Sequence, residues 1–379
     1  MTFCKKTALT TLLAAGVMAI SACSDDDGSS TSQASHPAPA SAPPASGSSK
    51  FKATVLVSST PGTAPNTDPN LENGWGIAFK PTGEVWVSDN STGKSSLYEG
   101  VGIIDSLVVA IPSGQNSPPA GPTGVVFNGT ADFAVTQNGK TSPGSFIFAA
   151  LDGTISAWAP TVAASSAVIA FDNGAGHAVY TGLAIASNGA GKLLYAADFN
   201  NGKVDVFDKN FKKVVLDGKF EDSNLPAHFS PFGIQALGGN IFVSYAQQNP
   251  NGGPEEHGAG LGYVDEFDTS GHFLKRIGTQ GTLNAPWGMV IASANFGSFS
   301  NDLLIGNFGD GTINAFDPNT GAFLGQLVQQ DGTVLTVPGL WGIAFGNGFD
   351  NQPVDTLFFA AGPTPTSGNY GSITLAPGG

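Results

Sequence analysis

The sequence has only two cysteines, Cys4 and Cys23, and both fall near its start. The rest of the chain therefore has no thiol for disulfides, cysteine nucleophiles or thiolate metal sites. Sustained helical periodicity is missing too, which argues against an α-helical fold. Positive charge is scarce: 15 Lys and Arg stand against 29 Asp and Glu, and Arg276 is the only arginine. The net charge of −14 argues against a nucleic-acid partner, which needs a basic surface.

The first fifty residues indicate export rather than folding. Two lysines precede an apolar stretch at 8–20 that is too short to span a bilayer. Ile20-Ser21-Ala22-Cys23 then resembles the lipobox of bacterial lipoproteins, whose cysteine is acylated. We predict a signal peptide over 1–22, lipidation of Cys23 and a disordered Ser/Pro/Ala tether over 23–50. This places the protein in the bacterial cell envelope, lipid-anchored at the periplasmic or outer-membrane face. The alternative is an ordinary secretory signal with an incidental cysteine.

A glycine recurs inside a short apolar strand six times, at intervals of 48 to 58 residues. The six positions are Gly76, Gly124, Gly182, Gly233, Gly288 and Gly342. Each repeat continues with a second apolar strand, and Asp, Asn and Gly mark the turns between strands. A period near fifty residues is the size of one four-stranded propeller blade. We predict an all-β fold over 51–379, a six-bladed β-propeller with four-stranded antiparallel blades.

The two ends of this region complement each other. After Gly342 there is room for three strands, and one unassigned strand, 51–58, precedes the first repeat. We predict that 51–58 pairs outside 371–375, so that the N-terminal strand completes the last blade and closes the ring.

The repeats resemble those of NHL-type propellers. From Pro61 to the end, the chain resembles an uncharacterised family of bacterial secreted propellers. The segments that carry this resemblance are 73–79, 195–199, 306–311 and 339–348. Some members end in an exosortase sorting signal, whereas this sequence ends in Pro377-Gly378-Gly379. The resemblance implies the propeller fold and no established activity.

Four of the six residues that precede a repeat glycine are aromatic: Trp75, Phe232, Trp287 and Trp341. Equivalent positions of the blades face one mouth of the central channel, where propellers usually bind ligands. Aromatic faces there can stack on a sugar, a flat organic molecule or a side chain of a partner protein. The alternative is that these rings fill the space between blades.

Three histidines are further candidates for ligand binding. His177 and His228 each lie five residues before a repeat glycine, which places them near one another at one mouth. Neutral imidazoles there can hold a metal or act as a base, or they are loop residues that bond to backbone carbonyls. His257 follows two glutamates in the long insertion 247–262, which can fold over the mouth as a lid.

Asp89, Asp198 and Asn307 each end the second strand of a blade. In NHL-like repeats such residues cap the following turn. The alternative comes from a resemblance to gluconolactonase-like hydrolases, in which carboxylates and amides from several blades hold one divalent ion such as Ca²⁺. That ion polarises a lactone carbonyl and activates water. Streptogramin-lyase-like propellers are a second comparison, but their His and Glu set does not align with this chain.

No catalytic motif such as Gly-x-Ser-x-Gly in a strand-turn-helix setting or His-Glu-x-x-His is present. We therefore expect a lipid-anchored extracytoplasmic propeller that binds a small molecule, a glycan or an envelope protein at one mouth. A metal-dependent hydrolase or lyase is the first alternative. A structural envelope protein is the second.

Overall fold

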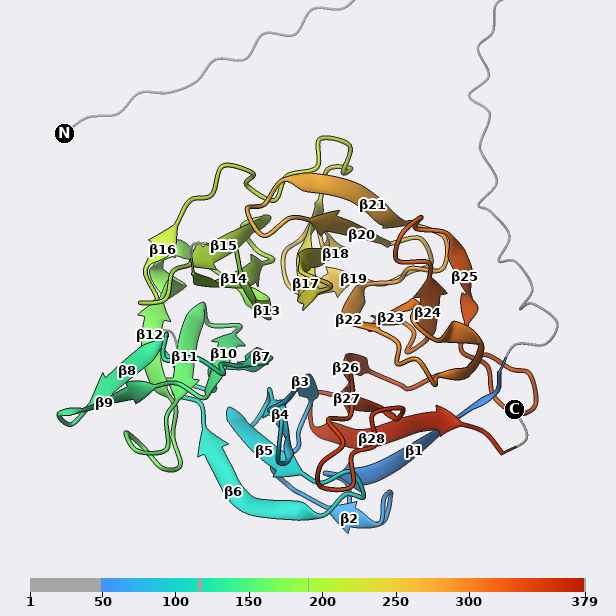
Figure 1. Cartoon of the computed structure of the whole chain (residues 1–379), viewed down its shortest axis with the longest axis horizontal. Coiled ribbons are helices and arrows are strands. Elements are labelled where there is room, and N and C mark those ends of the chain that lie inside the picture. Colours follow the sequence, from blue (N-terminus) through green and yellow to red (C-terminus); the bar gives the residue numbers. More distant parts are fainter. Residues whose placement is uncertain (1–48, 115–117, 190, 378–379) are drawn as a thin grey trace, which may run out of the picture. The chain divides into compact units, whose positions relative to one another are not determined.

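Six small antiparallel sheets surround one axis in the computed structural model, which describes residues 49–114, 118–189 and 191–377 (Figure 1). The predicted six-bladed β-propeller is confirmed. The innermost strands of consecutive blades lie side by side, and the innermost strand of the last blade lies beside that of the first. None of the helices in the described ranges is long and apolar enough to cross a membrane.

The first three blades run from the axis outward in chain order. Blade 1 consists of β3 (Gly74–Phe79), β4 (Val85–Asp89), β5 (Lys94–Tyr98) and β6 (Ile104–Ala110). Blade 2 consists of β7 (Pro122–Phe127), β10 (Phe146–Ala150), β11 (Thr154–Trp158) and β12 (Val168–Asp172), with an inserted hairpin of β8 (Ala134–Gln137) and β9 (Lys140–Pro143). Blade 3 follows the short helix η1 (Gly174–Gly176) and consists of β13 (Tyr180–Ser187), β14 (Lys192–Asp198), β15 (Lys203–Phe207) and β16 (Lys213–Val214).

The next two blades repeat the design, and the last one incorporates the N-terminal strand. Blade 4 consists of β17 (Phe229–Leu237), β18 (Asn240–Gln248), β20 (Gly262–Phe267) and β21 (Phe273–Thr279), with β19 (Glu255–Glu256) paired to β18. Blade 5 consists of β22 (Pro286–Ile291), the short helix η2 (Gly297–Phe299), β23 (Leu303–Asn307), β24 (Ile313–Phe316) and β25 (Phe323–Gln326). Blade 6 consists of β26 (Leu340–Phe345), β27 (Leu357–Thr364), β28 (Ser367–Leu375) and β1 (Phe51–Ser58), with β2 (Asn66–Thr67) parallel to β1.

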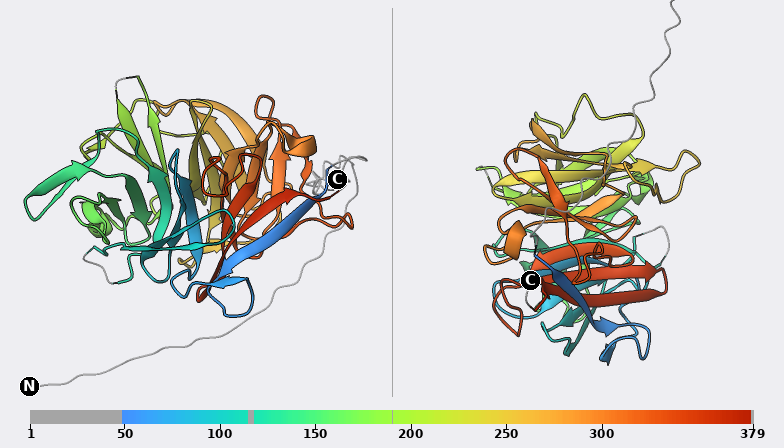
Figure 2. Two further views of the ribbon diagram at one scale, coloured as in Figure 1. Left: turned by 60° about the horizontal axis from the view of Figure 1, so that its bottom comes forward. Right: turned by 90° about the vertical axis from the view of Figure 1, so that its right-hand side faces the viewer.

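The N-terminal strand closes the ring as predicted. β1 runs antiparallel to β28, from Phe51 opposite Leu375 to Ser58 opposite Asn369, and the two strands lie side by side in Figure 2. The Phe51 ring is fully buried against Phe296, with the ring centroids 4.8 Å apart. The last blade is therefore built from both ends of the described chain, which holds the first and last blades together.

The repeat glycines lie where the innermost strands approach one another. A Cβ atom on Gly76 would lie 2.3 Å from the carbonyl oxygen of Thr123 in the next blade, a separation that real Cβ atoms essentially never show. The equivalent separations at four other repeat glycines are also below 3.0 Å: Gly124 2.3 Å, Gly233 2.2 Å, Gly288 2.4 Å and Gly342 2.6 Å. Gly182 has slightly more space, 3.2 Å. The glycines recur because the backbones of neighbouring blades are in contact at each of these positions around the axis.

The outer halves of three blades share a polar pair between a buried side chain of the third strand and a half-buried one of the fourth. Asp205 bonds Lys213 at 2.6 Å, Asp265 bonds Arg276, and Asn314 accepts a hydrogen bond from Gln326 at 3.1 Å. Burial raises the pKa of Asp265 to about 7, although the Arg276 guanidinium acts in the opposite direction. These pairs tie the outermost strand to its blade and leave the axis to apolar contacts.

We expect Gly76→Ala to lower the free energy of unfolding by about 3 kcal/mol, because its methyl group would overlap the Thr123 carbonyl of the next blade. Gly182→Ala should be milder, since its neighbours lie 3.2 Å away. Gly191→Ala is the matched control, because nothing lies within 4 Å of the place where its methyl group would sit. Urea unfolding would measure all three, and equal midpoints for Gly76→Ala and Gly191→Ala would contradict this account.

Candidate functional site

The four predicted aromatic residues come together at the axis. Trp75, Phe232, Trp287 and Trp341 form one cluster, and each of them is at least nine-tenths buried. Phe199 and Phe308 join them, and we call the six residues the aromatic plug. The Trp341 ring is stacked on both Trp75 and Phe308, with centroid separations of 3.4 and 3.7 Å. These rings therefore fill the channel by packing mainly against one another.

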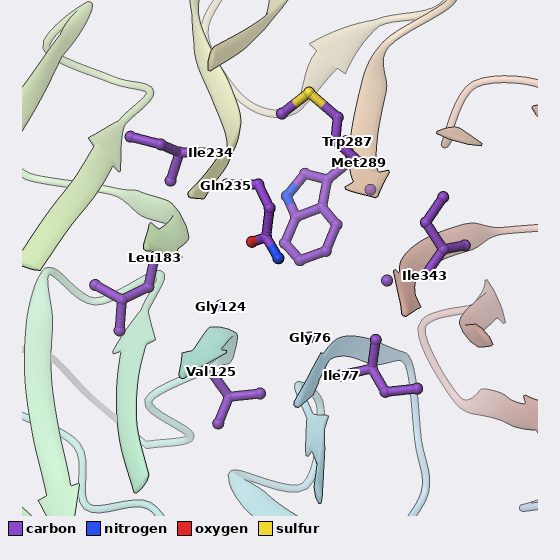
Figure 3. A pocket seen from close by; sticks show the side chains of 12 residues that line it. Gly76, Ile77, Gly124, Val125, Leu183, Ile234, Gln235, Trp287, Met289 and Ile343 are labelled. Atoms are coloured by element: carbon purple, nitrogen blue, oxygen red, sulfur yellow. The ribbon is translucent and has the colours of Figure 1, made fainter. Parts of the chain in front are cut away.

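Trp287 closes the channel by reaching between two blades that are not neighbours. It belongs to β22 of blade 5, and its indole Nε1 donates a hydrogen bond of 2.8 Å to the Thr181 carbonyl of blade 3. Figure 3 shows the indole in the middle of the ring of inner strands. Its edge contacts Trp75 and Trp341 at centroid separations of 6.0 and 5.7 Å. The plug is thus anchored by a hydrogen bond as well as by packing.

The channel beside the plug is narrow, and both backbone and aliphatic groups line it. Its cavity volume is about 30 Å³, which is room for about two waters. Repeat glycines and the aliphatic residues that follow them line it, together with the amide side chain of Gln235 (Figure 3). A sugar or a flat organic ligand is much larger than this space. A ligand of that size would have to bind at the mouth or displace the plug.

The indole nitrogens of the plug differ in their hydrogen bonding. Trp341 Nε1 donates to Asn73 Oδ1 at 3.3 Å, just before the first inner strand. Trp75 Nε1 is buried and has no hydrogen-bond partner within the described ranges. A buried N–H group without an acceptor typically costs about 1–3 kcal/mol. Trp75 therefore carries an unsatisfied donor inside the plug.

His177 and His228 lie in the segments that lead into the innermost strands β13 and β17 of blades 3 and 4. We call the loops at this end of the blades, where the plug lies, the rim. A chain of hydrogen bonds connects the backbones of the two histidines. The His177 carbonyl accepts from Asn200 Nδ2 at 2.9 Å, and the His228 carbonyl accepts from Gln248 N at 2.7 Å. Gln248 Nε2 in turn donates to the carbonyls of Phe199 and Asn200 at 2.7 and 3.3 Å. Both histidines are exposed. The rim of blades 3 and 4 is thus built by amide side chains and leads directly to the plug residue Phe199.

His257 lies in the insertion of blade 4 and contacts blade 5. Its Nε2 is 3.0 Å from Glu255 Oε1, and its ring meets Phe308 edge-on with centroids 5.1 Å apart. The next residue, Gly258, donates its N–H to Asn284 Oδ1 at 2.7 Å. The hydrogen bond to Glu255 raises the pKa of His257, against a smaller opposing effect of burial. The insertion therefore forms a bridge from blade 4 to the edge of the plug.

Asp89, Asp198 and Asn307 each have partners in their own blade. Asp89 is fully buried and accepts from Ser96 Oγ at 2.6 Å, and burial raises its pKa well above the usual value. Asp198 Oδ1 accepts from the backbone N–H of Val179 at 3.1 Å. Asn307 Oδ1 accepts from the N–H of Asn284 at 3.2 Å. In blades 3 and 5 the side chain therefore ties the end of the second strand to the segment that enters the innermost one.

Four members of the predicted metal set, Asp89, Asp198, His177 and His228, do not form a metal-holding group of three. Within residues 49–114, 118–189 and 191–377, no group of three His, Cys, Asp or Glu side chains is arranged to hold a metal ion. The aromatic residues are the predicted site residues that form one cluster.

Three relatives with related sequences come from Acanthamoeba polyphaga mimivirus. "Uncharacterized protein R648" is 34% identical over 304 residues, which covers 78% of this chain and 73% of the viral protein. "Uncharacterized protein L690" is 31% identical over 303 residues and covers 78% of each chain. The chain belongs to the family of these proteins. The family thus includes viral proteins, whereas the motifs resemble those of bacterial secreted ones, and no family model matches the sequence.

Solved structures resemble the family's fold at low sequence identity. A glucose dehydrogenase superimposes with a TM-score of 0.52 at 13% identity, over 86% of this chain and 99% of that one. The PQQ-bound aldose sugar dehydrogenase from Streptomyces coelicolor gives 0.51 at 13% identity, over 88% and 100%. Virginiamycin B lyase from Staphylococcus aureus reaches 0.44 at 14% identity, over 86% and 100%. The likeness to the two dehydrogenases supports the six-bladed fold and nothing finer.

The sequence pattern also held a signal for Phe199 and Phe308, which we did not predict as site residues. Each follows directly after a residue that ends a second strand, in Asp198-Phe199 and Asn307-Phe308. The last residue of each of these second strands pairs with the start of the innermost strand: Asp198 with Tyr180 and Asn307 with Pro286. An aromatic residue that follows it therefore also lies near the axis. An Asp or Asn at the end of a second strand, followed directly by an aromatic residue, is thus the sequence pattern that indicates a further plug residue.

We expect His257→Gln to lower the free energy of unfolding more at pH 5 than at pH 8. The folded state raises the pKa of His257, so its contribution is present when the ring is protonated and is lost as pH rises through that value. The loss at pH 5 should be about 0.5 kcal/mol, because the His257 side chain of the pair is 44% exposed. Urea unfolding at both pH values provides the measurement.

His272→Gln is the matched control for this experiment. His272 is also exposed and also bonds an aspartate, Asp268, at 2.9 Å, but it lies beside the outer strand β21. Only the His257 variant should also alter the tryptophan emission spectrum, since His257 contacts the plug. An equal loss of stability at pH 5 and pH 8 for His257→Gln would argue against the ion pair.

Proposed function

We propose that this protein is a binding propeller whose ligand lies on the rim around the aromatic plug. The observation that carries the proposal is a continuous series of ring contacts from the surface inward. Exposed His257 contacts Phe308, Phe308 stacks on Trp341, and Trp341 stacks on Trp75. A small molecule, a glycan or a partner's side chain that packs against His257 and Phe308 would therefore contact the outer end of this series of packed rings.

The rim chemistry supports a ligand with both apolar and polar groups. Exposed His257 offers a ring and a titratable nitrogen beside Phe308, and exposed His177 and His228 lie on segments that Asn200 and Gln248 link to the backbone of the plug residue Phe199. The unpaired Trp75 Nε1 would gain a partner if a ligand brought an acceptor oxygen into the plug. A sugar hydroxyl or a carbonyl group has that character.

No observation within the described residues favours the hydrolase or lyase alternative. Asp198 and Asn307 accept hydrogen bonds from backbone N–H groups of their own blades, and similarity to the sugar dehydrogenases concerns the fold. The proposal accordingly assigns binding to the rim and assigns no catalytic residue.

A ligand screen followed by tryptophan fluorescence tests this proposal. Three of the five tryptophans belong to the plug, so a rim ligand should shift the emission spectrum. We expect Phe308→Ala or His257→Ala to weaken binding of such a ligand about tenfold, because each removes a ring at the plug edge. Affinity would be measured by titration calorimetry.

Trp86→Phe is the control variant, because Trp86 is stacked on Phe146 between blades 1 and 2 at 4.1 Å and lies outside the plug. It should leave the affinity unchanged. A ligand that binds with wild-type affinity to both the Phe308→Ala and His257→Ala variants would place the binding site elsewhere on the protein.

We also propose that Cys23 carries a lipid that anchors the protein at the cell envelope. Cys23 lies outside the described residues, and the proposal is supported by the lipobox-like segment 20–23 alone. We expect wild-type protein produced in a bacterium to fractionate with membranes and to incorporate labelled fatty acid. Cys23→Ser should do neither, and a variant that stays with the membrane fraction would contradict lipid anchoring.

A further inference from the structure

Exposed apolar side chains gather where the first and last blades meet. Val101 and Ile103 lie in the β5–β6 turn of blade 1 and are 52% and 53% exposed. Phe349 and Val354 lie in the β26–β27 loop of blade 6 and are 46% and 56% exposed. We call these four residues the seam patch. Large apolar side chains gathered on a surface are a common mark of an interaction site.

The two loops of the seam patch are held together by their backbones. Gly100 N donates to the Asp350 carbonyl at 2.9 Å, and Asn351 Nδ2 donates to Glu99 Oε2 at 3.0 Å. A Cβ on Gly100 would lie 1.7 Å from the Asn351 carbonyl oxygen, so only glycine permits this contact. The patch is therefore preformed, which lowers the ordering cost of binding a partner.

The seam patch and the plug lie at opposite ends of the blades. In blade 6, Trp341 is near the start of β26, whereas the β26–β27 loop follows its last residue, Phe345. In blade 1, Gly74 at the plug end of β3 pairs with Asp89, whereas Phe79 at the far end pairs with Val85. Val85 also pairs with Tyr98, the last residue of β5. The β5–β6 turn thus lies at the far end as well. The patch is a surface separate from the rim.

Two carboxylates lie beside the seam patch, because Asp350 follows Phe349 and Glu99 accepts a hydrogen bond from Asn351 Nδ2. Partial desolvation raises the pKa of Asp350, and the nearby carboxylates of Glu84 and Glu99 raise it further, with Lys80 as the opposing charge. The seam patch therefore combines apolar side chains with local negative charge.

We propose that the seam patch binds a segment of a partner protein in which lysine or arginine side chains flank apolar ones. The apolar residues would pack on Val101, Ile103, Phe349 and Val354, and the basic ones would pair with Glu84, Glu99 and Asp350. A second copy of this chain is a poor occupant, because its net charge of −14 repels an acidic surface. Nucleic acid and anionic lipid are repelled for the same reason.

The test uses two fluorescein-labelled synthetic peptides of equal length, one of alternating lysine and leucine and one of alternating glutamate and leucine. Fluorescence anisotropy with the full chain measures binding of each. We expect the lysine peptide to bind, to weaken as salt rises and to bind about tenfold more weakly to the double variant Val101→Ser with Ile103→Ser. Glu84→Gln with Asp350→Asn should weaken it by a similar factor.

Two control variants separate the seam patch from general attraction to an acidic protein. Leu274→Ser with Leu324→Ser removes two residues of similar exposure, 48% and 40%, from outer strands. Asp217→Asn with Glu221→Gln removes the same charge from another exposed surface. Neither control should change the affinity, and urea unfolding confirms that every variant is folded. Equal effects of patch and control variants, equal binding of the glutamate peptide, or no binding of the lysine peptide would each overturn the proposal.

Discussion

Backbone contact between neighbouring blades at the axis is the constraint on which the rest of the structure depends. Each repeat glycine faces the main chain of the next innermost strand, and a side chain at most of these positions would collide with it. This contact sets the radius of the ring and leaves a channel with room for about two waters. The residue before each glycine then has to share the small space that remains. The plug follows from the glycines, because close strands bring those residues within reach of one another.

The architecture was predictable because the sequence repeats the same strand and turn pattern about every fifty residues. Glycines at matched spacing, apolar strands between turn residues, and a leading strand that complements an incomplete last repeat together predicted six blades and their closure. The convergence of Trp75, Phe232, Trp287 and Trp341 followed from their equivalent positions. Whether these aromatic faces were free or buried could not be predicted, because that depends on how far each indole reaches across the axis.

The polar part of the candidate site was less predictable, because it depends on loops that differ between repeats. His177 and His228 have equivalent positions, yet the side chains of Asn200 and Gln248 determine how that rim is built. Asp198 and Asn307 bond the segments that enter the innermost strands, a choice that periodicity does not reveal. The seam patch joins turns some 250 residues apart, such as Glu99 and Asn351, and its contacts become visible only in the fold.

The two repeat positions that lack an aromatic residue explain the asymmetry of the plug. At these positions Thr123 and Thr181 donate their hydroxyls to the carbonyls of Tyr180 and Phe232 in the following blades, at 2.7 and 2.8 Å. The main-chain carbonyl of Thr181 also receives the indole N–H of Trp287 from across the channel. An indole at position 181 would compete for the space that Trp287 occupies. The threonines therefore leave room at the axis for the three tryptophans that close the channel, and they make the plug asymmetric.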